Sequence, residues 1–318
     1  MNTKPIIVIS GEPLGVFNEI FLKIKKKFFK KPIILIGSKK LLDQEAKKFK
    51  YKIDLNLMNL MNLNLKRIDN KKINLIDVNC TLNKTKDPSK EIKKYIQKCF
   101  DIGINLIKNH KCSGLINGPI NKKTFLNYQY PGITEYLALK FKIKTFAMLI
   151  YTKDLAVCPI TTHMPLKNVH KSITKNNIIK KIQLIDSFYK QKLGRKPKIA
   201  VTGLNPHCES PSKLNEEKKI IIPAINFLKR NKILINGPFS ADTIFLKDKI
   251  KKFDVIVGMY HDQVLTPIKA LYNFDAINIT LGLPFIRISP DHGPNQNMYG
   301  KNLSNPKSLL QAIKFLDN

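Results

Sequence analysis

The sequence predicts an α/β fold in which short buried strands alternate with amphipathic helices. Apolar, β-branched runs at 5–10 (PIIVIS) and 32–36 (PIILI) each stop at a glycine turn, as buried strands do. Lysine-faced helical segments follow at 16–30 and 38–49, and this alternation is typical of a parallel sheet. Because 318 residues with 43% hydrophobic content exceed the usual size of one core, we expect two domains or one bilobed unit.

The remaining elements are predicted from similar patterns. A Leu/Asn alternation at 53–65 has the period of an exposed edge strand, although compositional drift in a tolerant region explains it equally well. Asp87 and Pro88 suit the N-cap and first position of a helix that extends to about residue 109. We further expect strands at 113–117, 145–151, 155–161, 198–202, 233–235 and 254–257, and helices at 174–193, 214–231 and 307–316.

The formal charge of +33 first suggests a nucleic-acid-binding protein. Nearly all of this charge is lysine, however, because arginine occurs only at Arg67, Arg195, Arg230 and Arg287. Nucleic-acid-binding proteins rely on arginine for bidentate contacts, whereas a surplus of Lys, Asn and Ile is typical of an AT-rich genome. We therefore expect no nucleic-acid partner, and we expect the charge to attract small anionic substrates.

The cysteines predict a reducing compartment. All five are widely spaced and none forms a CxxC pair: Cys80, Cys99, Cys112, Cys158 and Cys208. The N-terminal apolar run is too short for a signal peptide, and Lys and Asn interrupt the other runs well short of the ~20 residues of a membrane span. We expect a soluble, cytoplasmic protein with no membrane partner.

Three of the six histidines follow apolar strands and adjoin turns: His163 in TTHMP, His207 in GLNPHCE and His261 in MYHDQ. Such positions meet at one edge of a parallel sheet, where three neutral imidazoles would form a catalytic zinc-type site. Their spacing matches no local metal motif, so turn capping or hydrogen bonding within the core is the alternative. His110 and His170 lie in lysine-rich segments and are expected to have no special role.

Eight short motifs occur in order along the chain: GEP, GPINK, G-x-TE, TTHMPL, GLNPH, NGPFSADT, MYHDQ and NITLGLPFIRISPDHG. Together they resemble the 4-hydroxythreonine-4-phosphate dehydrogenases of vitamin B6 biosynthesis. The resemblance extends from Gly11 to about Gly300, and each of the three histidines stands in a matching motif. Each motif alone is weak, so the order of all eight is what makes the resemblance specific.

The resemblance implies an enzyme that oxidises the C3 hydroxyl of 4-phosphohydroxy-L-threonine with NAD or NADP. The β-keto acid then loses CO2 and leaves 3-amino-2-oxopropyl phosphate. The implied fold has two α/β/α lobes around a cleft and is similar to that of isocitrate and isopropylmalate dehydrogenases. It is not a Rossmann fold, and the chain has no GxGxxG motif. A homodimer with active sites shared between its subunits is also implied.

The implied lobes divide the chain unevenly. One lobe, on the dinucleotide side, is expected at 1–124 with 276–318. The other, at 125–275, is expected to carry the metal, the substrate and the dimer contacts. By the resemblance, the residues that bind the metal (Zn, Mg or Co) are His163, His207 and His261. The residues that bind the phosphorylated amino-acid substrate are Thr134, Lys269, Asn278 and Arg287.

The remaining assignments concern catalysis and the cofactor. Lys269 suits an anionic substrate and is also a candidate catalytic residue. Asp242 and Asp262 are candidates either for orienting the metal-binding histidines or for proton transfer, and turn capping is the alternative for both. His292 and Gly293 are candidates for the cofactor site.

Two departures from the family pattern are visible. Ile133 replaces the histidine of a G-H-T-E motif, and the loss of a polar contact to a charged substrate weakens binding by roughly ten- to a hundredfold. Residues 294–300 (PNQNMYG) replace Thr-Ala and an apolar helix start next to the expected cofactor. A family member with reduced turnover therefore remains as an alternative. Two remoter alternatives are a basic nucleic-acid-binding protein, from the charge, and a metal-dependent hydrolase that uses the same three histidines.

Overall fold

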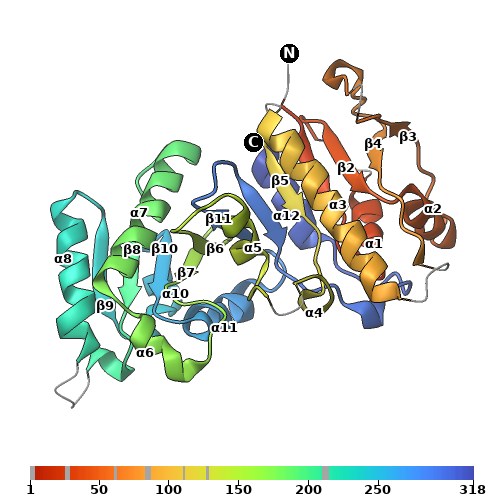
Figure 1. The fold of residues 1–318 in the computed structure, drawn as a ribbon. Coiled ribbons are helices and arrows are strands. Elements are labelled where there is room, and N and C mark those ends of the chain that lie inside the picture. Colours follow the sequence, from red (N-terminus) through yellow and green to blue (C-terminus); the bar gives the residue numbers. More distant parts are fainter. Residues whose placement is uncertain are drawn as a thin grey trace. The chain divides into compact units, whose positions relative to one another are not determined.

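The computed structural model describes residues 4–25, 29–60, 63–82, 87–109, 112–126, 129–209 and 215–318. The chain forms two compact units: unit 1 is Met1–Ile133 with Phe285–Asn318, and unit 2 is Thr134–Pro284. The chain therefore leaves unit 1 once and returns to it near the C-terminus (Figure 1). The chain passes from unit 1 to unit 2 after residue 133, where residue 124 was expected, and returns to unit 1 at residue 285, where residue 276 was expected. Both boundaries therefore lie nine residues later than predicted.

Unit 1 contains a parallel sheet with the strand order β3-β4-β2-β1-β5-β12. Its strands are β1 (Ile6–Ile9), β2 (Ile33–Gly37), β3 (Leu55–Leu57), β4 (Ile73–Asp77), β5 (Gly114–Asn117) and β12 (Arg287–Pro290). The central strands are fully buried, as expected for a sheet covered on both faces. The last strand, β12, comes from the C-terminal segment and pairs with β5.

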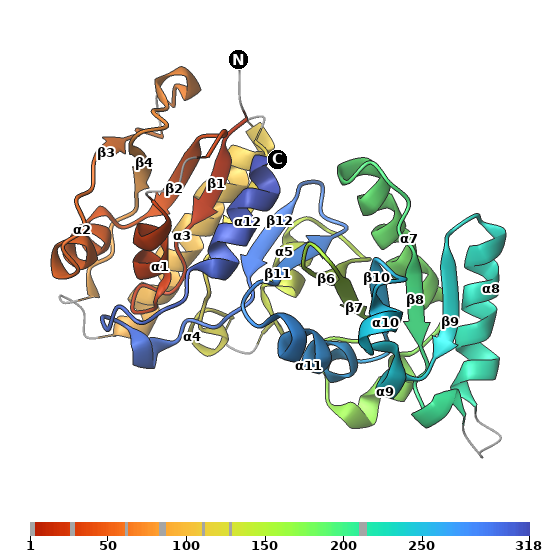
Figure 2. The same cartoon turned by 180° about the vertical axis from the view of Figure 1, so that it is seen from behind.

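Helices cover both faces of this sheet. They are α1 (Phe17–Ile24), α2 (Lys39–Lys48), α3 (Pro88–Asn109), α4 (Lys122–Leu126) and α12 (Lys307–Asp317). Leu115 of β5 faces Gly103 of α3, whereas its neighbour Gly114 faces Leu316 of α12. Since successive strand residues point to opposite faces, α3 lies on one side and α12 with α1 on the other, as Figures 1 and 2 show. Short 3-10 turns occur at Leu65–Arg67 and Gln296–Met298.

Unit 2 contains a mixed sheet with the strand order β11-β6-β7-β10-β8-β9. Its strands are β6 (Ala147–Tyr151), β7 (Ala156–Pro159), β8 (Ile199–Thr202), β9 (Ile235–Phe239), β10 (Val255–Gly258) and β11 (Ile277–Leu281). The β6/β7 and β6/β11 pairs are antiparallel, and the other pairs are parallel. The carboxyl ends of β7, β10 and β8 therefore lie side by side, and each leads into one of the predicted histidine loops.

The helices of unit 2 also lie on both faces of their sheet. They are α5 (Ile133–Lys140), α6 (Val169–Ser172), α7 (Lys175–Lys192), α8 (Ile222–Arg230), α9 (Ala241–Ile244), α10 (Lys247–Ile250) and α11 (His261–Tyr272). Val157 of β7 packs with Val264 and Ile268 of α11 in one apolar cluster. The next residue, Cys158, faces Lys181 of α7. The sheet is therefore sandwiched between α11 on one side and α7 on the other.

Several predicted elements are confirmed almost to the residue. The helix predicted at 87–109 is α3, and the Asp87 carboxylate accepts a hydrogen bond from the Lys90 N–H at 3.1 Å, as an N-cap should. The helix predicted at 174–193 is α7, which Thr174 caps through the N–H of Asn177. The strands predicted at 145–151 and 155–161 are β6 and β7. All of these signals are local, so a single sequence was enough to find them.

Other boundaries were wrong. The strand predicted at 233–235 is β9, which begins at Ile235 and continues through Pro238; proline is tolerated there because β9 is an edge strand. The helix predicted at 16–30 ends as α1 at Ile24, and residues 26–28 lie outside the described residues. The helix predicted from 214 begins as a π-helical turn at Glu217–Ile221, and residue 214 itself is not described. Among the described residues of the Leu/Asn alternation, β3 is the one strand, and it is an edge strand as predicted.

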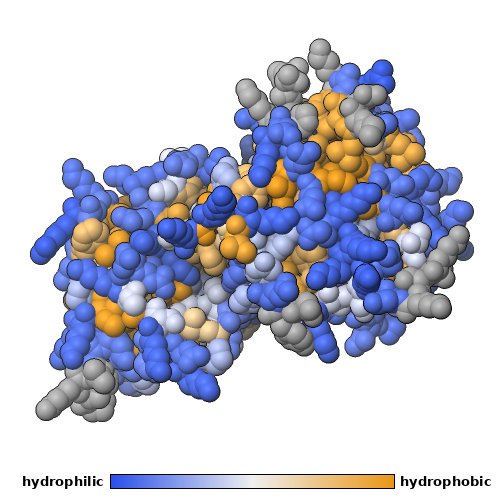
Figure 3. Space-filling model, in the orientation of Figure 1, coloured by the Kyte–Doolittle hydropathy of each residue, from blue (hydrophilic) through white to orange (hydrophobic). Residues whose placement is uncertain are grey.

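The surface reflects the lysine-rich composition. Hydrophilic side chains cover most of the face in Figure 3, with one larger apolar patch at the upper right and smaller ones elsewhere. His170 is exposed on α6, in keeping with its lysine-rich context, whereas His110 lies outside the described residues. Among the described helices, none combines the length and apolar character needed to cross a membrane.

Candidate active site

The loops that carry His163 and His261 are tied together at the ends of β7 and β10. The Ile160 N–H donates to the Gly258 carbonyl at 2.8 Å, and the Thr161 N–H donates to the Met259 carbonyl at 3.1 Å. The Thr161 hydroxyl reaches the same Met259 carbonyl at 2.8 Å. These bonds extend the parallel ladder past the strand ends, so the two histidine loops leave the sheet at the same place.

The imidazoles of His163 and His261 lie next to each other as a result. Their ring centroids are 5.7 Å apart, with an angle of 42° between the rings. About a third of each side chain is exposed, 32% for His163 and 33% for His261. Two imidazoles at this separation can face the same small ligand.

The third predicted ligand, His207, lies on a separate 3-10 turn, Pro206–Cys208, after β8. Its φ of 55° is uncommon for a residue other than glycine, and such backbone conformations occur at functional loops. Its side chain is 78% exposed. Among the described residues, no three His, Cys, Asp or Glu side chains form a cluster that could hold a metal, so His207 does not complete a site with the other two.

Each of the three histidines has a carboxylate beside its Nδ1 atom. The distances are 2.6 Å from His261 to Asp262, 3.8 Å from His163 to Glu135 and 4.0 Å from His207 to Asp242. Of these three contacts, the one between His261 and Asp262 is a hydrogen bond, which favours the tautomer with the proton on Nδ1 and leaves Nε2 as a lone-pair donor; the other two are longer-range electrostatic contacts. In metalloproteins, metal-binding histidines commonly have this kind of partner, so the donor set fits a divalent metal by its chemistry.

Gln263 fixes the loops after β8 and β10 relative to each other. Its Oε1 atom accepts hydrogen bonds from the Met259 N–H at 2.6 Å and from the Thr202 hydroxyl at 2.9 Å. Its Nε2 atom donates to the Gly203 carbonyl at 2.8 Å. Because Gln263 is only 9% exposed, this polar bridge lies in the core and rigidly couples the two strand ends.

Glu217 holds the loop that carries His207. Its Oε1 atom accepts the N–H groups of Leu204 and Asn205, both at 2.8 Å, and its Oε2 atom accepts from the Asn205 side chain at 3.0 Å. Burial alone would raise the pKa of Glu217, but the hydrogen bonds from Asn205 and Leu204 outweigh it and lower the pKa. The carboxylate therefore stays charged and anchors the loop.

Three of the predicted substrate residues lie in unit 2. The Thr134 hydroxyl, in the first turn of α5, is 3.3 Å from the Thr280 hydroxyl of β11. Asn278 also lies on β11, and its Oδ1 atom is buried without a hydrogen-bond partner. Burying an acceptor without a hydrogen bond costs free energy. A ligand group that donates a hydrogen bond to this oxygen would recover that cost and so bind more tightly. Lys269 lies in the last turn of α11 and is half-buried.

The remaining predicted residues lie in unit 1. Arg287 is 2% exposed on β12, and its Nε–H donates to the Asn117 side chain at 2.8 Å. His292 and Gly293 follow the carboxyl end of the same strand, where the His292 Nδ1 atom lies 2.9 Å from the Gly293 carbonyl. The Asp291 N–H donates to the Ser308 hydroxyl at 2.8 Å and so fixes this loop against α12.

The chain is similar to proteins of one family along nearly its full length. The family described as pyridoxal phosphate biosynthetic protein PdxA matches residues 29–316. The chain belongs to the PdxA family. A PdxA relative from Sulfurihydrogenibium sp. (strain YO3AOP1), a 4-hydroxythreonine-4-phosphate dehydrogenase, is 40% identical over 316 residues, which are 97% of this chain and 96% of the relative.

Solved structures agree with the PdxA assignment. The 4-hydroxythreonine-4-phosphate dehydrogenase of Klebsiella pneumoniae superposes with a TM-score of 0.83 at 28% identity, covering 99% of this chain and 98% of that one. An isocitrate dehydrogenase from Methylococcus capsulatus has a TM-score of 0.51 at 12% identity, covering 99% and 85% of the two chains. This second likeness is one of fold alone, and it confirms the predicted dehydrogenase-like α/β fold.

The PdxA motifs contain one site residue that the sequence prediction missed. Glu135 directly follows Thr134 in the G-x-TE motif, and it lies near both the His163 imidazole and the Thr162 hydroxyl, the latter at 3.4 Å. The motif itself was the available signal. The contact between Glu135 and His163 could not be predicted from the sequence, because the two residues lie on different elements that come together only in the folded sheet.

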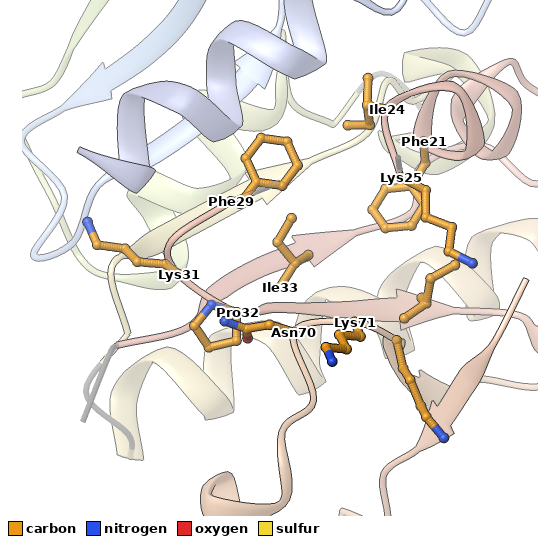
Figure 4. Close-up of a pocket in the computed structure, with 11 residues that line it drawn as sticks. Phe21, Ile24, Lys25, Phe29, Lys31, Pro32, Ile33, Asn70 and Lys71 are labelled. Carbon is orange, nitrogen blue, oxygen red and sulfur yellow. The ribbon is translucent and has the colours of Figure 1, made fainter. Parts of the chain in front are cut away.

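A pocket in unit 1 of this PdxA family member lies away from the predicted residues (Figure 4). Its volume is about 60 Å³, and it lies at the amino ends of β2 and β4. Apolar side chains of Phe21, Ile24 and Ile33 form its floor, with lysines around it. His292 and Gly293, by contrast, follow the carboxyl end of β12, so we assign this pocket no part in the reaction.

Proposed function

We propose that the chain is a metal-dependent 4-hydroxythreonine-4-phosphate dehydrogenase linked to NAD or NADP. It would oxidise the C3 hydroxyl of 4-phosphohydroxy-L-threonine, and the β-keto acid would then lose CO2 to give 3-amino-2-oxopropyl phosphate. Membership of the PdxA family supports the substrate class. The observation that carries the metal dependence is the carboxylate beside Nδ1 of each predicted histidine ligand.

His163, His207 and His261 would hold the divalent metal through their Nε2 atoms. When bound, the metal would act as a Lewis acid on the C3 oxygen and on the ketone that follows from it. Asp262 would orient His261, since its carboxylate is 2.6 Å from Nδ1. Glu135 and Asp242 lie 3.8 and 4.0 Å from the Nδ1 atoms of His163 and His207, so they would have to come closer to orient these rings by hydrogen bonds. The exposed turn of His207 would also have to move toward the other two histidines.

The substrate would be held by groups that match its charges. Lys269 supplies a point charge and Arg287 a planar fork for the phosphate and carboxylate. Asn278 would accept a hydrogen bond from the substrate at its unpartnered Oδ1 atom, and Thr134 would add a hydroxyl from the first turn of α5. To take the hydroxyl proton, Lys269 would act in its uncharged form, and the ammonium that results would be the point charge that faces the anionic groups; the nicotinamide, when bound, would supply the hydride acceptor.

The nicotinamide cofactor would bind on the unit 1 side, near His292 and Gly293. We also propose that the enzyme acts as a homodimer in which each active site contains residues of both subunits.

The test is a spectrophotometric assay at 340 nm with 4-phosphohydroxy-L-threonine, NAD or NADP, and Zn, Mg or Co varied in turn. We expect reduced cofactor to form only with metal and substrate present. No reduction at saturating metal, substrate and cofactor would refute the proposal. His261→Ala should lose metal content and activity together, and a variant that keeps both would rule out the proposed metal site.

A further inference from the structure

A second cavity in unit 2, of about 370 Å³, lies beside the N-terminus of α7. It lies on the α7 face of the sheet, since Cys158 points toward Lys181 whereas Val157 packs against α11. His261 begins α11, which covers the opposite face. The cavity therefore lies on the opposite face of the sheet from α11, but it adjoins the His163 loop, because Thr162 and Met164 are part of its lining.

Three lysines line this cavity, and none of its described lining residues is acidic. Lys144 and Lys180 are exposed at its rim, whereas Lys181 is 8% exposed. The Lys181 ammonium donates to the Ile160 carbonyl at 2.8 Å and lies 6.0 Å from the centroid of the Phe146 ring. Since an ammonium has three N–H donors, two remain for a ligand in the cavity.

Uncharged donors complete the lining. Thr174 caps α7, an 18-residue helix with no acidic residue in its first turn. The N–H of Asn176, the second helical residue, cannot bond within the helix and adds to the positive end of the helix dipole. The hydroxyl of Ser172 and the amide side chains of Asn176 and Asn177 also face the cavity. Hydroxyls, amides and ammonium groups together match the several oxygens of a phosphate.

The buried position of Lys181 supports an anionic occupant. Burial disfavours the charged ammonium and lowers the pKa of Lys181, against smaller favourable contributions from Cys158 and Glu135. A buried charge is costly even with these partners, and a counter-ion in the cavity would offset part of that cost.

We propose that this cavity is a binding site for a phosphate group, held by Lys144, Lys180 and Lys181 at the N-terminus of α7. The occupant is either inorganic phosphate or a small phosphomonoester. The proposal does not depend on the dehydrogenase activity, because its test measures phosphate binding alone; the cavity itself adjoins the His163 loop through Thr162 and Met164.

The experiment measures the thermal unfolding midpoint of the full chain against increasing inorganic phosphate, with ionic strength held constant by sodium chloride. A parallel series uses glycerol 3-phosphate, and tighter binding in either series identifies the source of the phosphate group. We expect a saturable rise in the midpoint for the wild type. Lys181→Met and Lys180→Gln should each weaken the apparent affinity by about tenfold or more.

The matched control is Lys192→Gln at the end of α7, which removes one exposed charge from the same helix but far from the cavity. It is needed because a chain with a formal charge of +33 attracts all anions weakly. Retained affinity in this control supports the proposal. An equal loss in the control, no saturable shift in the wild type, or a loss caused by Lys269→Ala but not by the cavity variants would overturn it.

Discussion

The carboxylate of Asp262 lies 2.6 Å from the Nδ1 atom of His261, in the first turn of α11. A hydrogen bond at this distance fixes both the tautomer and the rotation of the imidazole ring. Loss of such a partner typically costs ten- to a hundredfold in metal affinity. We therefore expect Asp262→Ala to raise the apparent dissociation constant of the activating metal by about that factor, measured by titrating metal into the chelator-treated enzyme.

The control for this substitution is Asp248→Ala on α10, an exposed aspartate in the same unit. It should leave the metal titration unchanged. An Asp262→Ala enzyme that binds metal as tightly as the wild type would show that the carboxylate does not orient His261.

Gln263 should be important for stability as well as for geometry. Gln263→Leu keeps the size of the side chain but leaves the Met259 N–H, the Thr202 hydroxyl and the Gly203 carbonyl without their buried partner. Each unsatisfied group costs about 1–3 kcal/mol, so we expect the free energy of unfolding to fall by roughly 3 kcal/mol or more. Urea denaturation would measure it, with the exposed Gln44→Leu on α2 as the control.

Glu45 predicts a pH dependence of stability in unit 1. Burial first, and the neighbouring Glu19 second, raise the pKa of Glu45 from 4.5 to about 7. Between these values the folded chain holds a proton that the unfolded chain has lost. The stability from this group is therefore fully present below about pH 4.5 and is lost as the pH rises through about 7.

Glu45→Gln should remove this loss. Relative to the wild type, the variant should gain roughly 2–3 kcal/mol in free energy of unfolding between pH 5 and pH 8.5. Denaturant unfolding of both proteins across this range gives the difference directly. If the difference between them stays constant with pH, Glu45 is not the titrating group.

Ile133 offers a gain-of-function test. It is the first residue of α5, next to Thr134 and Glu135, at the position where the G-H-T-E motif has histidine. Ile133→His would restore a polar contact to a charged substrate, and we expect the KM for 4-phosphohydroxy-L-threonine to fall by about tenfold. Steady-state kinetics at saturating cofactor would measure the effect. Ile133→Asn provides a control for polarity alone, and an unchanged KM in the histidine variant would indicate that a neighbour already compensates.

The sequence was sufficient wherever the signal was local. Asp87 marked the start of α3, because a capping side chain acts on its own helix. The buried strands before the three histidines were likewise visible as apolar, β-branched runs. The family assignment was also within reach, since eight motifs in order need no structure to be recognised.

The rest of the site depends on contacts between distant residues. The helix that begins at His261 was not among the predicted elements, and α11 contains Pro267 in its interior. No sequence pattern could pair Glu135 with His163, or place Gln263 between the ends of β8 and β10, because these contacts exist only after the strands align. The register of Thr161 against Met259 is a tertiary property of the same kind.

Unit 1 is assembled from both ends of the chain. Arg287 and Ile288 of β12 pair with β5, and Leu309 and Ile313 of α12 are fully buried. During synthesis, the first 133 residues leave the ribosome without this strand and helix, whereas unit 2 is one continuous segment. Unit 2 can therefore complete its core before unit 1 does. A premature stop codon that removed only α12 would disable unit 1, although most of unit 1 is synthesised first.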